Sequence, residues 1–309
     1  AAPLTWIRLG SATSAEIEQL ANTLKPADIM SVQAKDPGDA SYTRIVANGK
    51  AEWIKINPGM DKAAAFLETH RYAAYKGASM GFTKMEGTTV NARDKVAYSA
   101  LQNCEKSMVA GDAANVPGNG ISIPRQLKAG VIMALSLRGG QKVTDGKAIN
   151  SEWMPVDTKA LLAGEDIAAD ALGNTANPDR IANPDNLKFS EKLRTLFIGE
   201  DSGMHVNNFL WAYNVDTKQL SRILSTPAGA ESTGLQGVDN VNGWMYVMSN
   251  FQHPGDWEIK TVTANGVTNT TGLHAKVFQT LEPLIDKNYE NGYGAAVGYI
   301  TGLPQTTKV

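Results

Sequence analysis

The carboxyl-terminal half of the chain is a series of short strand-like segments separated by turns, and this rhythm limits the fold more than any other feature. In NFLWAYNV, the side chains of Phe209, Trp211 and Tyr213 recur with a period of two, which is typical of a strand with one buried face. The segments QLSRILST and WMYVMSN repeat this style. Many short strands broken by turns are typical of a sandwich, a barrel or a propeller. The up-and-down pairs and the loose recurrence of blade-length phrases favour a mainly β fold, a β-propeller of antiparallel sheets.

Two segments are predicted to be helices inserted into this all-β framework. Residues 14–24 carry apolar side chains at helical spacing, and Ser14 is a candidate amino-terminal cap. Residues 61–75 form the stronger pattern, with Asp61 as the cap. We therefore expect a single propeller-like domain over residues 1–309 with helical insertions near these two segments.

Turn signals predict the positions of the other elements. Asn48-Gly49 lies between two β-type runs, and a second Asn-Gly pair lies between β-branched runs near residue 265. Such pairs are typical of tight β-hairpins. The remaining expectations are a first strand at 4–9, a hairpin over 44–56, two strands over 85–102, a strand at 130–139, a helical turn at 157–164, a hairpin over 259–271 and a final strand within 291–303.

Length, charge and cysteine content narrow the class of protein. The chain has 309 residues, 42% of them hydrophobic, which is enough for one large β domain with a real core. Its formal net charge is −2, and it has no basic cluster long enough to indicate a nucleic-acid partner. The longest apolar run, GVIMALSL, is too short to span a membrane. Because Cys104 is the one cysteine, no intrachain disulfide can form.

Acidic residues follow or begin several of the short apolar runs. Asp185 lies in a turn, Glu200 and Asp201 come directly after LRTLFI, and Glu231 lies in a Gly/Ser/Thr loop. Carboxylates at strand ends place hard oxygen donors at the rim of a sheet, and several such rims meeting would bind a calcium-like cation. The alternative is that these are ordinary turn residues, because Asp and Asn are common in turns.

Two histidines are further candidates with an alternative interpretation each. His253, in QHPGD, could bind a metal or donate a proton, or it could hydrogen-bond the tight turn made by Pro254-Gly255. His70, in the segment predicted as the second helix, could serve a site or could pack and pair on the surface.

Several motifs resemble those of a known family. The segments IANPDNLKF, LFIGED, LWAYNV, AESTG and NFQHPGD are similar to segments of the PhoX-type alkaline phosphatases and their wider bacterial relatives. The likeness extends upstream to KAAAFLETHRYAA and FTKMEGTTVNARDKVAY and covers most of residues 50–256. Its most specific parts are AESTG followed by QHPGD, and the KAAAFLETHRYAA segment followed by KMEG.

The resemblance implies a β-propeller with helical insertions and a metal site at one end of its central channel. In characterised relatives, calcium with iron hydrolyses phosphomonoesters outside the cytoplasm, which implies a periplasmic or secreted protein with a small phosphorylated substrate. Carried over by motif, Glu86, Asp201 and Glu231 match the family's acidic residues and are the expected metal ligands. Asp185 matches the Asp of a turn, for which a structural role is the alternative.

The chain also departs from the family pattern. The iron-binding Cys-Glu-Glu segment is absent, and Cys104 follows Glu86 instead of preceding it, so we expect a packed thiol and not a metal ligand. The strand that supplies an arginine and a carboxylate in the family corresponds to GVIMALSL, and Arg138 follows it in the wrong register. The family's first blades have no counterpart before Ala1, so a partner chain or a missing amino-terminal segment is expected to complete the propeller.

These observations leave two main hypotheses open. The first is a metal-dependent phosphoester hydrolase that uses a carboxylate-bound calcium or calcium and iron centre. The second is a non-catalytic propeller, a binding or scaffold protein that retains at most a calcium site. A lactonase-like propeller with a single calcium is a third idea. The hydrolase hypothesis requires Glu86, Asp201 and Glu231 to converge as metal ligands. Asp185, Glu200 and His253 are additional candidate ligands.

Overall fold

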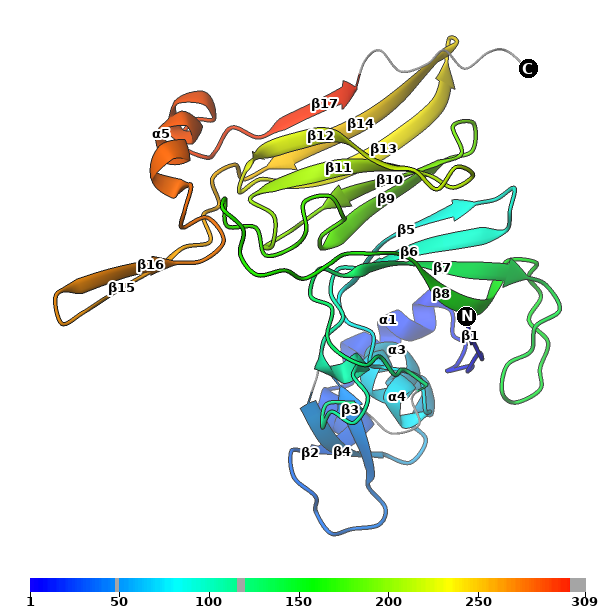
Figure 1. The fold of residues 1–309 in the computed structure, drawn as a ribbon. Helices are drawn as coiled ribbons and strands as arrows, with labels where there is room; N and C mark the ends of the chain where they lie inside the picture. The colour runs from blue at the N-terminus through cyan, green and yellow to red at the C-terminus, as the bar shows by residue number, and fades with distance from the viewer. Residues whose placement is uncertain (48–49, 116–119, 301–309) are drawn as a thin grey trace.

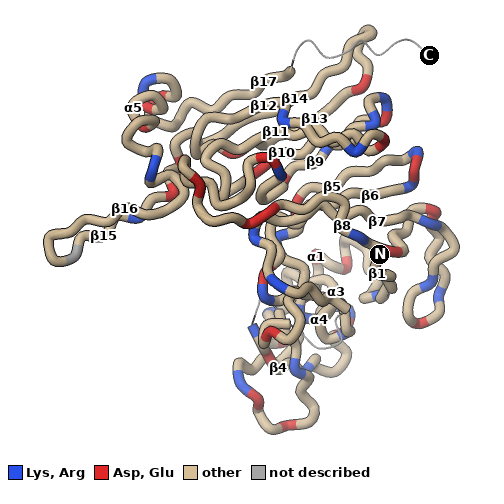
Figure 2. Tube along the Cα trace, viewed as in Figure 1, with Lys and Arg blue, Asp and Glu red and all other residues tan. Residues whose placement is uncertain are grey.

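The computed structural model describes residues 1–47, 50–115 and 120–300, and it is built mainly of antiparallel β-sheets (Figure 1). Within the described residues the sheets do not close into a barrel or a complete propeller. Residues of both charge signs are interspersed along the chain (Figure 2), in keeping with the small net charge. None of the described helices is long and apolar enough to be a transmembrane span.

The first large sheet contains five strands in the order β1-β8-β7-β6-β5. Alternate residues of its central strands, including Tyr98, Ala100 and Ile132, are buried in the main core. Residues 104–115 and 120–127 cover part of the opposite face, where Leu101 and Val131 pack against Met108. The strands are β1 (Ala2–Pro3), β5 (Met85–Asn91), β6 (Val96–Leu101), β7 (Val131–Arg138) and β8 (Met154–Ala163); a 3-10 turn, η1 (Lys106–Met108), follows β6.

The second sheet is a four-stranded up-and-down meander whose strands are neighbours in sequence order. Its strands are β9 (Pro184–Ser190), β10 (Thr195–Glu200), β11 (Asn207–Asn214) and β12 (Leu220–Ala228). Leu196, Ile198 and Trp211 are almost fully buried and form the main core together with residues of the first sheet. Because alternate residues of both sheets are buried in this one core, the two sheets pack face to face.

The third sheet packs on the other face of the second one. Phe197 and Leu210 of the second sheet meet Met245 and Val247 of the third in a separate core. This sheet consists of β13 (Glu231–Val241), β14 (Trp244–Gln252) and β17 (Ala296–Ile300) in the order β13-β14-β17. Between β14 and β17 the chain forms the projecting hairpin β15 (Lys260–Ala264) and β16 (Val267–Thr271), followed by α5 (Phe278–Asn288) (Figure 1).

The strands β5, β9 and β13 are each an edge strand of their sheet, and they lie next to one another. Two glycines permit this close approach. A Cβ atom at Gly87 would lie 2.4 Å from the carbonyl oxygen of Asp185, and one at Gly199 would lie 2.5 Å from that of Ser232. Any larger residue at either position would push neighbouring sheets apart, so these glycines set where the strand ends meet.

The amino-terminal part forms a separate layer with its own core. Ile54, Ala64 and Tyr72 are buried in it, and Arg71 pairs with Glu52 at 2.8 Å. Its elements are α1 (Ser14–Thr23), α2 (Pro26–Ile29), β2 (Met30–Gln33), β3 (Thr43–Ala47), β4 (Lys50–Ile56), α3 (Asp61–Leu67) and α4 (Thr69–Tyr75). This layer lies beside the first sheet, far from the third (Figure 1).

Both predicted helices are present, with differences at their ends. The first begins at Ser14, but its cap is Thr13, which accepts a hydrogen bond from the backbone of Glu16 and completes a capping box. The predicted helix over 61–75 is interrupted at Glu68 and forms two shorter helices. The hairpin over 44–56 is present as β3 and β4, while its turn at residues 48–49 lies outside the described residues.

Two predicted elements are wrong. Residues 157–164 were expected as a helical turn, but 157–163 belong to β8, because pairing with β7 from Val131 to Arg138 overrides the helical preference of KALLA. The expected strand at 4–9 is not formed; the pairing is shifted to Ala2–Pro3, and Trp6 makes only an isolated bridge with Val143. The strand expected within 291–303 is β17, and the hairpin over 259–271 is confirmed.

Candidate metal centre

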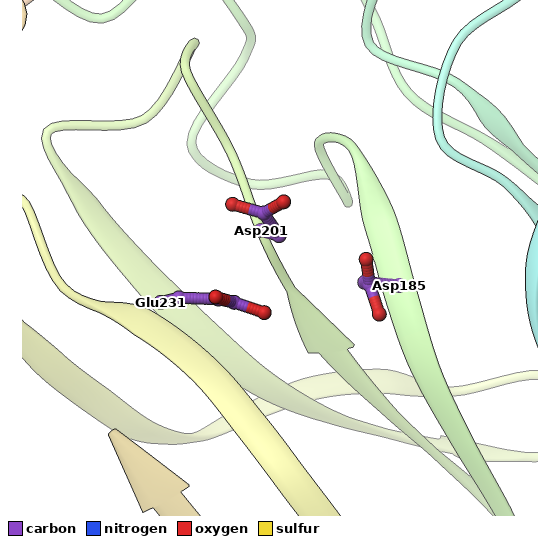
Figure 3. Close-up of side chains that lie close together, drawn as sticks. All are labelled: Asp185, Asp201 and Glu231. Carbon is purple, nitrogen blue, oxygen red and sulfur yellow. The ribbon is translucent and has the colours of Figure 1, made fainter. Parts of the chain in front are cut away.

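Three carboxylates converge where the edge strands meet. Asp185 is the second residue of β9, Asp201 directly follows β10, and Glu231 begins β13. One ligand oxygen from each lies within 4.8 Å of the others, and all three residues are half-buried. Figure 3 shows the three side chains around a common space between these strands. Such an oxygen-only set fits a hard cation such as calcium.

A register shift where β10 pairs with β9 positions Asp185 and Asp201. The register of the β9–β10 pairing shifts between Ile198 and Glu200, so the end of β10 departs from regular pairing with β9. Asn183, with φ of 44°, precedes β9 and its carbonyl oxygen accepts a hydrogen bond of 3.2 Å from the backbone of Asp201. Its side chain donates to the carbonyl oxygen of Gln102 at 2.9 Å. Asn183 therefore joins the first sheet to both acidic strand ends.

Amide side chains hold the carboxylates in place. Gln102 Nε2 donates to Asp201 Oδ2 at 2.9 Å and lies 3.5 Å from Asp185 Oδ2. Asn186 donates to Asp185 Oδ1 at 2.7 Å, and Gln252 donates to Glu231 Oε2. These neutral donors orient the carboxylates without neutralising their charge, so the site retains its attraction for a cation.

The electrostatics of the cluster show the cost of placing these charges together. Burial, first, and the charges of Glu86, Asp201 and Glu231 together raise the pKa of Asp185 to about 6. The nearby Lys84 acts in the opposite direction. A divalent cation at this position would favour the ionised form, because an opposite charge offsets both burial and repulsion.

Glu86, expected as a ligand, lies close to the cluster but is not one of its three members. Its Oε1 is 2.8 Å from the ammonium of Lys84, and its charge contributes to the raised pKa of Asp185. The third member of the cluster is Asp185, for which a structural role in a turn was the alternative. The convergence expected for Asp201 and Glu231 is present.

Glu200 is a core residue, which makes the additional expectation of a metal ligand there wrong. Its side chain is fully buried and has four partners. The carboxylate accepts hydrogen bonds from the backbone N–H groups of Ala182 at 2.8 Å and Phe209 at 3.0 Å. It also accepts one from Trp211 Nε1 at 2.6 Å and lies 3.0 Å from His205 Nδ1. Both carboxylate oxygens are thus occupied by protein groups. This network anchors the β10–β11 connection behind Asp201.

His253 lies at the margin of the site. Its Nε2 is 3.3 Å from Glu231 Oε2, and its Nδ1 is 3.8 Å from Asp256. With 45% of its side chain exposed and φ of 40°, it is held beside a carboxylate while remaining open to solvent. This position permits proton exchange with a bound molecule, and it also fits the alternative of a turn-stabilising side chain.

Cys104 is packed in the first sheet's outer core. It contacts the cluster that contains Leu101, Met108 and Val131, and burial raises the pKa of its thiol to about 11. A thiol held in its neutral form is a poor metal ligand, because metals bind the thiolate. It is not part of the acidic group that the described residues bring together.

Sequence reasoning missed Lys84, Gln102 and Asn183. Lys84 lies two residues before Glu86 in the KMEG segment, so its place in that motif was the signal that could have identified it. Gln102 and Asn183 carry no such signal, because their role depends on the meeting of separate sheets. When the chain is compared with protein-family models, with curated proteins and with solved structures, no match is found. The resemblance to PhoX-type phosphatases stays a prediction.

Proposed function

We propose that this chain binds a calcium-like cation through Asp185, Asp201 and Glu231 and hydrolyses small phosphomonoesters there, as its resemblance to PhoX-type phosphatases implies. The observation that supports this best is the meeting of three carboxylate oxygens within 4.8 Å, from strand ends that are far apart in sequence. Uncompensated carboxylates this close are costly, so a protein that keeps them together has a reason to bind a cation.

The arrangement of the sheets supports the propeller part of the proposal. Three antiparallel sheets stack face to face, and the edge strand β9 of the middle sheet lies against the edge strands β5 and β13 of the other two. In a propeller the first strand of every blade lies nearest the axis. We propose that these edge strands lie along part of such an axis and that further sheets, from a partner chain or a longer polypeptide, complete it.

The residues at the site fit calcium and do not fit thiolate-bound iron. The available donors are carboxylate oxygens, which calcium prefers. The iron of the resembling phosphatases is held through a cysteine, whereas Cys104 is buried elsewhere with a neutral thiol. We therefore propose calcium alone as the metal and derive no step through iron.

The chemistry follows from what these residues can hold. A bound cation would polarise a phosphoryl oxygen and offset its negative charge. Gln102 and Asn186 keep the carboxylates oriented toward the common space, and His253 is placed to exchange a proton with a leaving group. We propose a periplasmic or secreted location on the family resemblance alone.

A non-catalytic calcium-binding propeller is the second candidate, and one observation favours it. Strand β7, which corresponds to the family strand that supplies an arginine and a carboxylate, reads VIMALSLR. Its one arginine, Arg138, lies at the end of the strand remote from Gln102, with 69% of its side chain exposed and Asp157 at 3.9 Å. The guanidinium that would hold a phosphoryl group is therefore not supplied by this strand.

Calcium titration and phosphatase assays on the same protein separate the two. After chelation, wild-type protein is titrated with calcium by calorimetry and assayed with p-nitrophenyl phosphate at each calcium level. We expect micromolar to submillimolar binding and activity that follows calcium occupancy. Glu231→Gln should weaken calcium binding at least about tenfold, because it removes one charged ligand, and reduce activity together with it.

Asp179→Asn is the matched control, since its carboxylate is 81% exposed and, among the described residues, forms an ion pair with Arg222 alone. It should change neither property. Calcium binding without any phosphatase activity would support the non-catalytic candidate, and the absence of calcium binding would overturn both.

A further inference from the structure

A cavity of about 670 Å³ lies on the outer face of the first sheet, the face turned away from the second sheet. Its floor is formed by β7 and β8, where Met133 lies opposite Ala160 and Val131 lies opposite Ala163. None of the three carboxylates of the metal centre is among the described residues that line it. Cavities of this size are typical of sites for small organic molecules. It is therefore a candidate site separate from the metal centre.

Small side chains leave the floor of this cavity hollow. Ala160 and Ala163, which face outward from β8, are both exposed to solvent. On the other side, Ile123 and Leu127 line the cavity and pack only partly against the outer core. An apolar group that entered between these residues would remove their surfaces from water, which is favourable in proportion to the area buried.

The remaining apolar wall is adaptable. Met108, Met133 and Phe82 line the cavity and belong to the outer core or pack against it. Methionine side chains are unbranched and flexible, so they adjust to ligands of irregular shape. Cys104 also lines the cavity, and its buried thiol stays neutral and adds no charge. The wall therefore suits a flexible alkyl chain.

The charge of the lining is positive. Its charged residues are Arg125 and Lys159, and no aspartate or glutamate is among the described residues that line it. Lys159 lies opposite Ala134, which faces the main core, so Lys159 begins on the other face of β8. Arg125 is exposed and makes no ion pair within the part of the chain that the structure describes. Its guanidinium is therefore free to bind a carboxylate through paired hydrogen bonds.

Two other cavities of the molecule differ from this one in charge. One, of about 630 Å³, is lined by Asp166 and Asp201 beside the metal centre. The other, of about 490 Å³, lies between α4 and the first sheet and includes Glu105 in its wall. A carboxylate in the wall disfavours an anionic ligand, because like charges repel. The cavity over β7 and β8 is thus the one of the three whose charge fits an anion.

We propose that this cavity binds a small amphipathic anion, an aliphatic carboxylate of medium chain length. The alkyl chain lies over Ala160 and Ala163 and against Leu127, and the carboxylate accepts hydrogen bonds from the Arg125 guanidinium. Binding here is reversible and involves no covalent step. The inference does not depend on the proposed function, because the cavity shares no residue with the three metal ligands.

Calorimetric titration of the full chain with decanoate tests this inference. The titration is done in chelator, so that calcium reaches neither the metal centre nor the decanoate. We expect decanoate to bind about tenfold or more tightly than decyltrimethylammonium, which has the same chain and the opposite charge. Arg125→Met should weaken decanoate binding about tenfold, the loss expected for a charged hydrogen bond, and leave the affinity for 1-decanol unchanged. Arg138→Met, a change of another exposed arginine on the first sheet, is the matched control and should alter neither affinity.

A second variant tests the position of the alkyl chain. Ala160→Phe places a large side chain on the cavity floor and should weaken the binding of both decanoate and 1-decanol. Because Ala160 is exposed, the substitution leaves the cores of the protein intact, and circular dichroism checks the fold. Decanoate binding that is unchanged in both Ala160→Phe and Arg125→Met would place the ligand elsewhere and overturn the inference.

Three further results would also overturn it. The first is that the wild type does not bind decanoate, and the second is that it binds decyltrimethylammonium as tightly as decanoate. The third comes from sedimentation velocity: a wild-type dimer that Ala160→Phe dissociates would show that a second copy of the chain covers this face. A wild type whose association state is the same with and without decanoate supports a small-molecule site.

Discussion

The two ends of the β9–β10 hairpin both gather three carboxylates, but only at one end does a cationic side chain pair directly with all three. At the turn end, Arg194 lies between Asp94, Asp216 and Glu191, with 13% of its side chain exposed. These partners come from the turns of three hairpins. At the other end, Asp185 and Asp201 meet Glu231, and the nearest cation, Lys84, is bonded to Glu86.

The protonation equilibria of the two ends differ accordingly. Hydrogen bonds from Arg194 lower the pKa of Asp94 and of Asp216. Burial and neighbouring carboxylates raise the pKa of Asp185 to about 6. The comparison shows that this fold can stabilise clustered carboxylates with a side-chain cation of its own, as it does around Arg194. The end that lacks such a group is therefore the one suited to an external cation.

The largest expected effect is stabilisation by calcium at the open end only. At a calcium concentration about 100 times the dissociation constant, linkage stabilises the folded state by roughly 2.7 kcal/mol, which corresponds to a rise in Tm of about 5 °C. Asp201→Asn should abolish the rise, whereas Asp216→Asn, the same change at the Arg194 end, should preserve it. Differential scanning fluorimetry with and without chelator measures both, and equal shifts in the two variants would contradict the comparison.

The next effect is the loss of the internal countercharge. Arg194→Met leaves three carboxylates at the turn end without their cation and should lower Tm by about 2–6 °C at low salt, a range reduced for the solvent screening of the exposed partners. Arg138→Met, at an ion pair of 3.9 Å with 69% of the arginine exposed, should change Tm by less than about 1 °C. Calcium affinity should not change in Arg194→Met; a coupled loss would mean that the two ends are not independent.

The smallest effect is the pH dependence of the metal-free protein. Because folding raises the pKa of Asp185 above its usual 3.8, its contribution to stability is fully present below about pH 4 and is lost as pH rises through about 6. Asp94 and Asp216 act in the opposite sense, since their lowered pKa values give stability above pH 4 that is lost as pH falls below it.

Asp185→Asn removes the first of these contributions and not the second. In chelator, the Tm of Asp185→Asn should therefore fall less between pH 4 and 6.5 than that of the wild type, by about 2 °C. Identical pH profiles for the two proteins would show that folding does not raise the pKa of Asp185.

Local patterns in the sequence determined much of the fold. The helix predicted near residues 14–24 forms over Ser14–Thr23, although its cap is Thr13 and not Ser14, and the period-two strand that contains Phe209 and Trp211 and the hairpin over 259–271 form as predicted. These features depend on contacts between residues close in sequence, such as the Thr13–Glu16 capping box. The sequence also predicted acidic strand ends at Asp201 and Glu231, because each carboxylate lies in a turn next to an apolar run.

Only the tertiary structure decided which carboxylates face the site. Glu200 and Asp201 are adjacent, and in a strand adjacent side chains point to opposite faces, so a single register shift exchanges their roles. The irregularity after Ile198 turns Glu200 toward Trp211 in the core and leaves Asp201 beside Asp185. In the same way, pairing with β7 made residues 157–163 a strand, because long-range hydrogen bonds outweigh local helical preference.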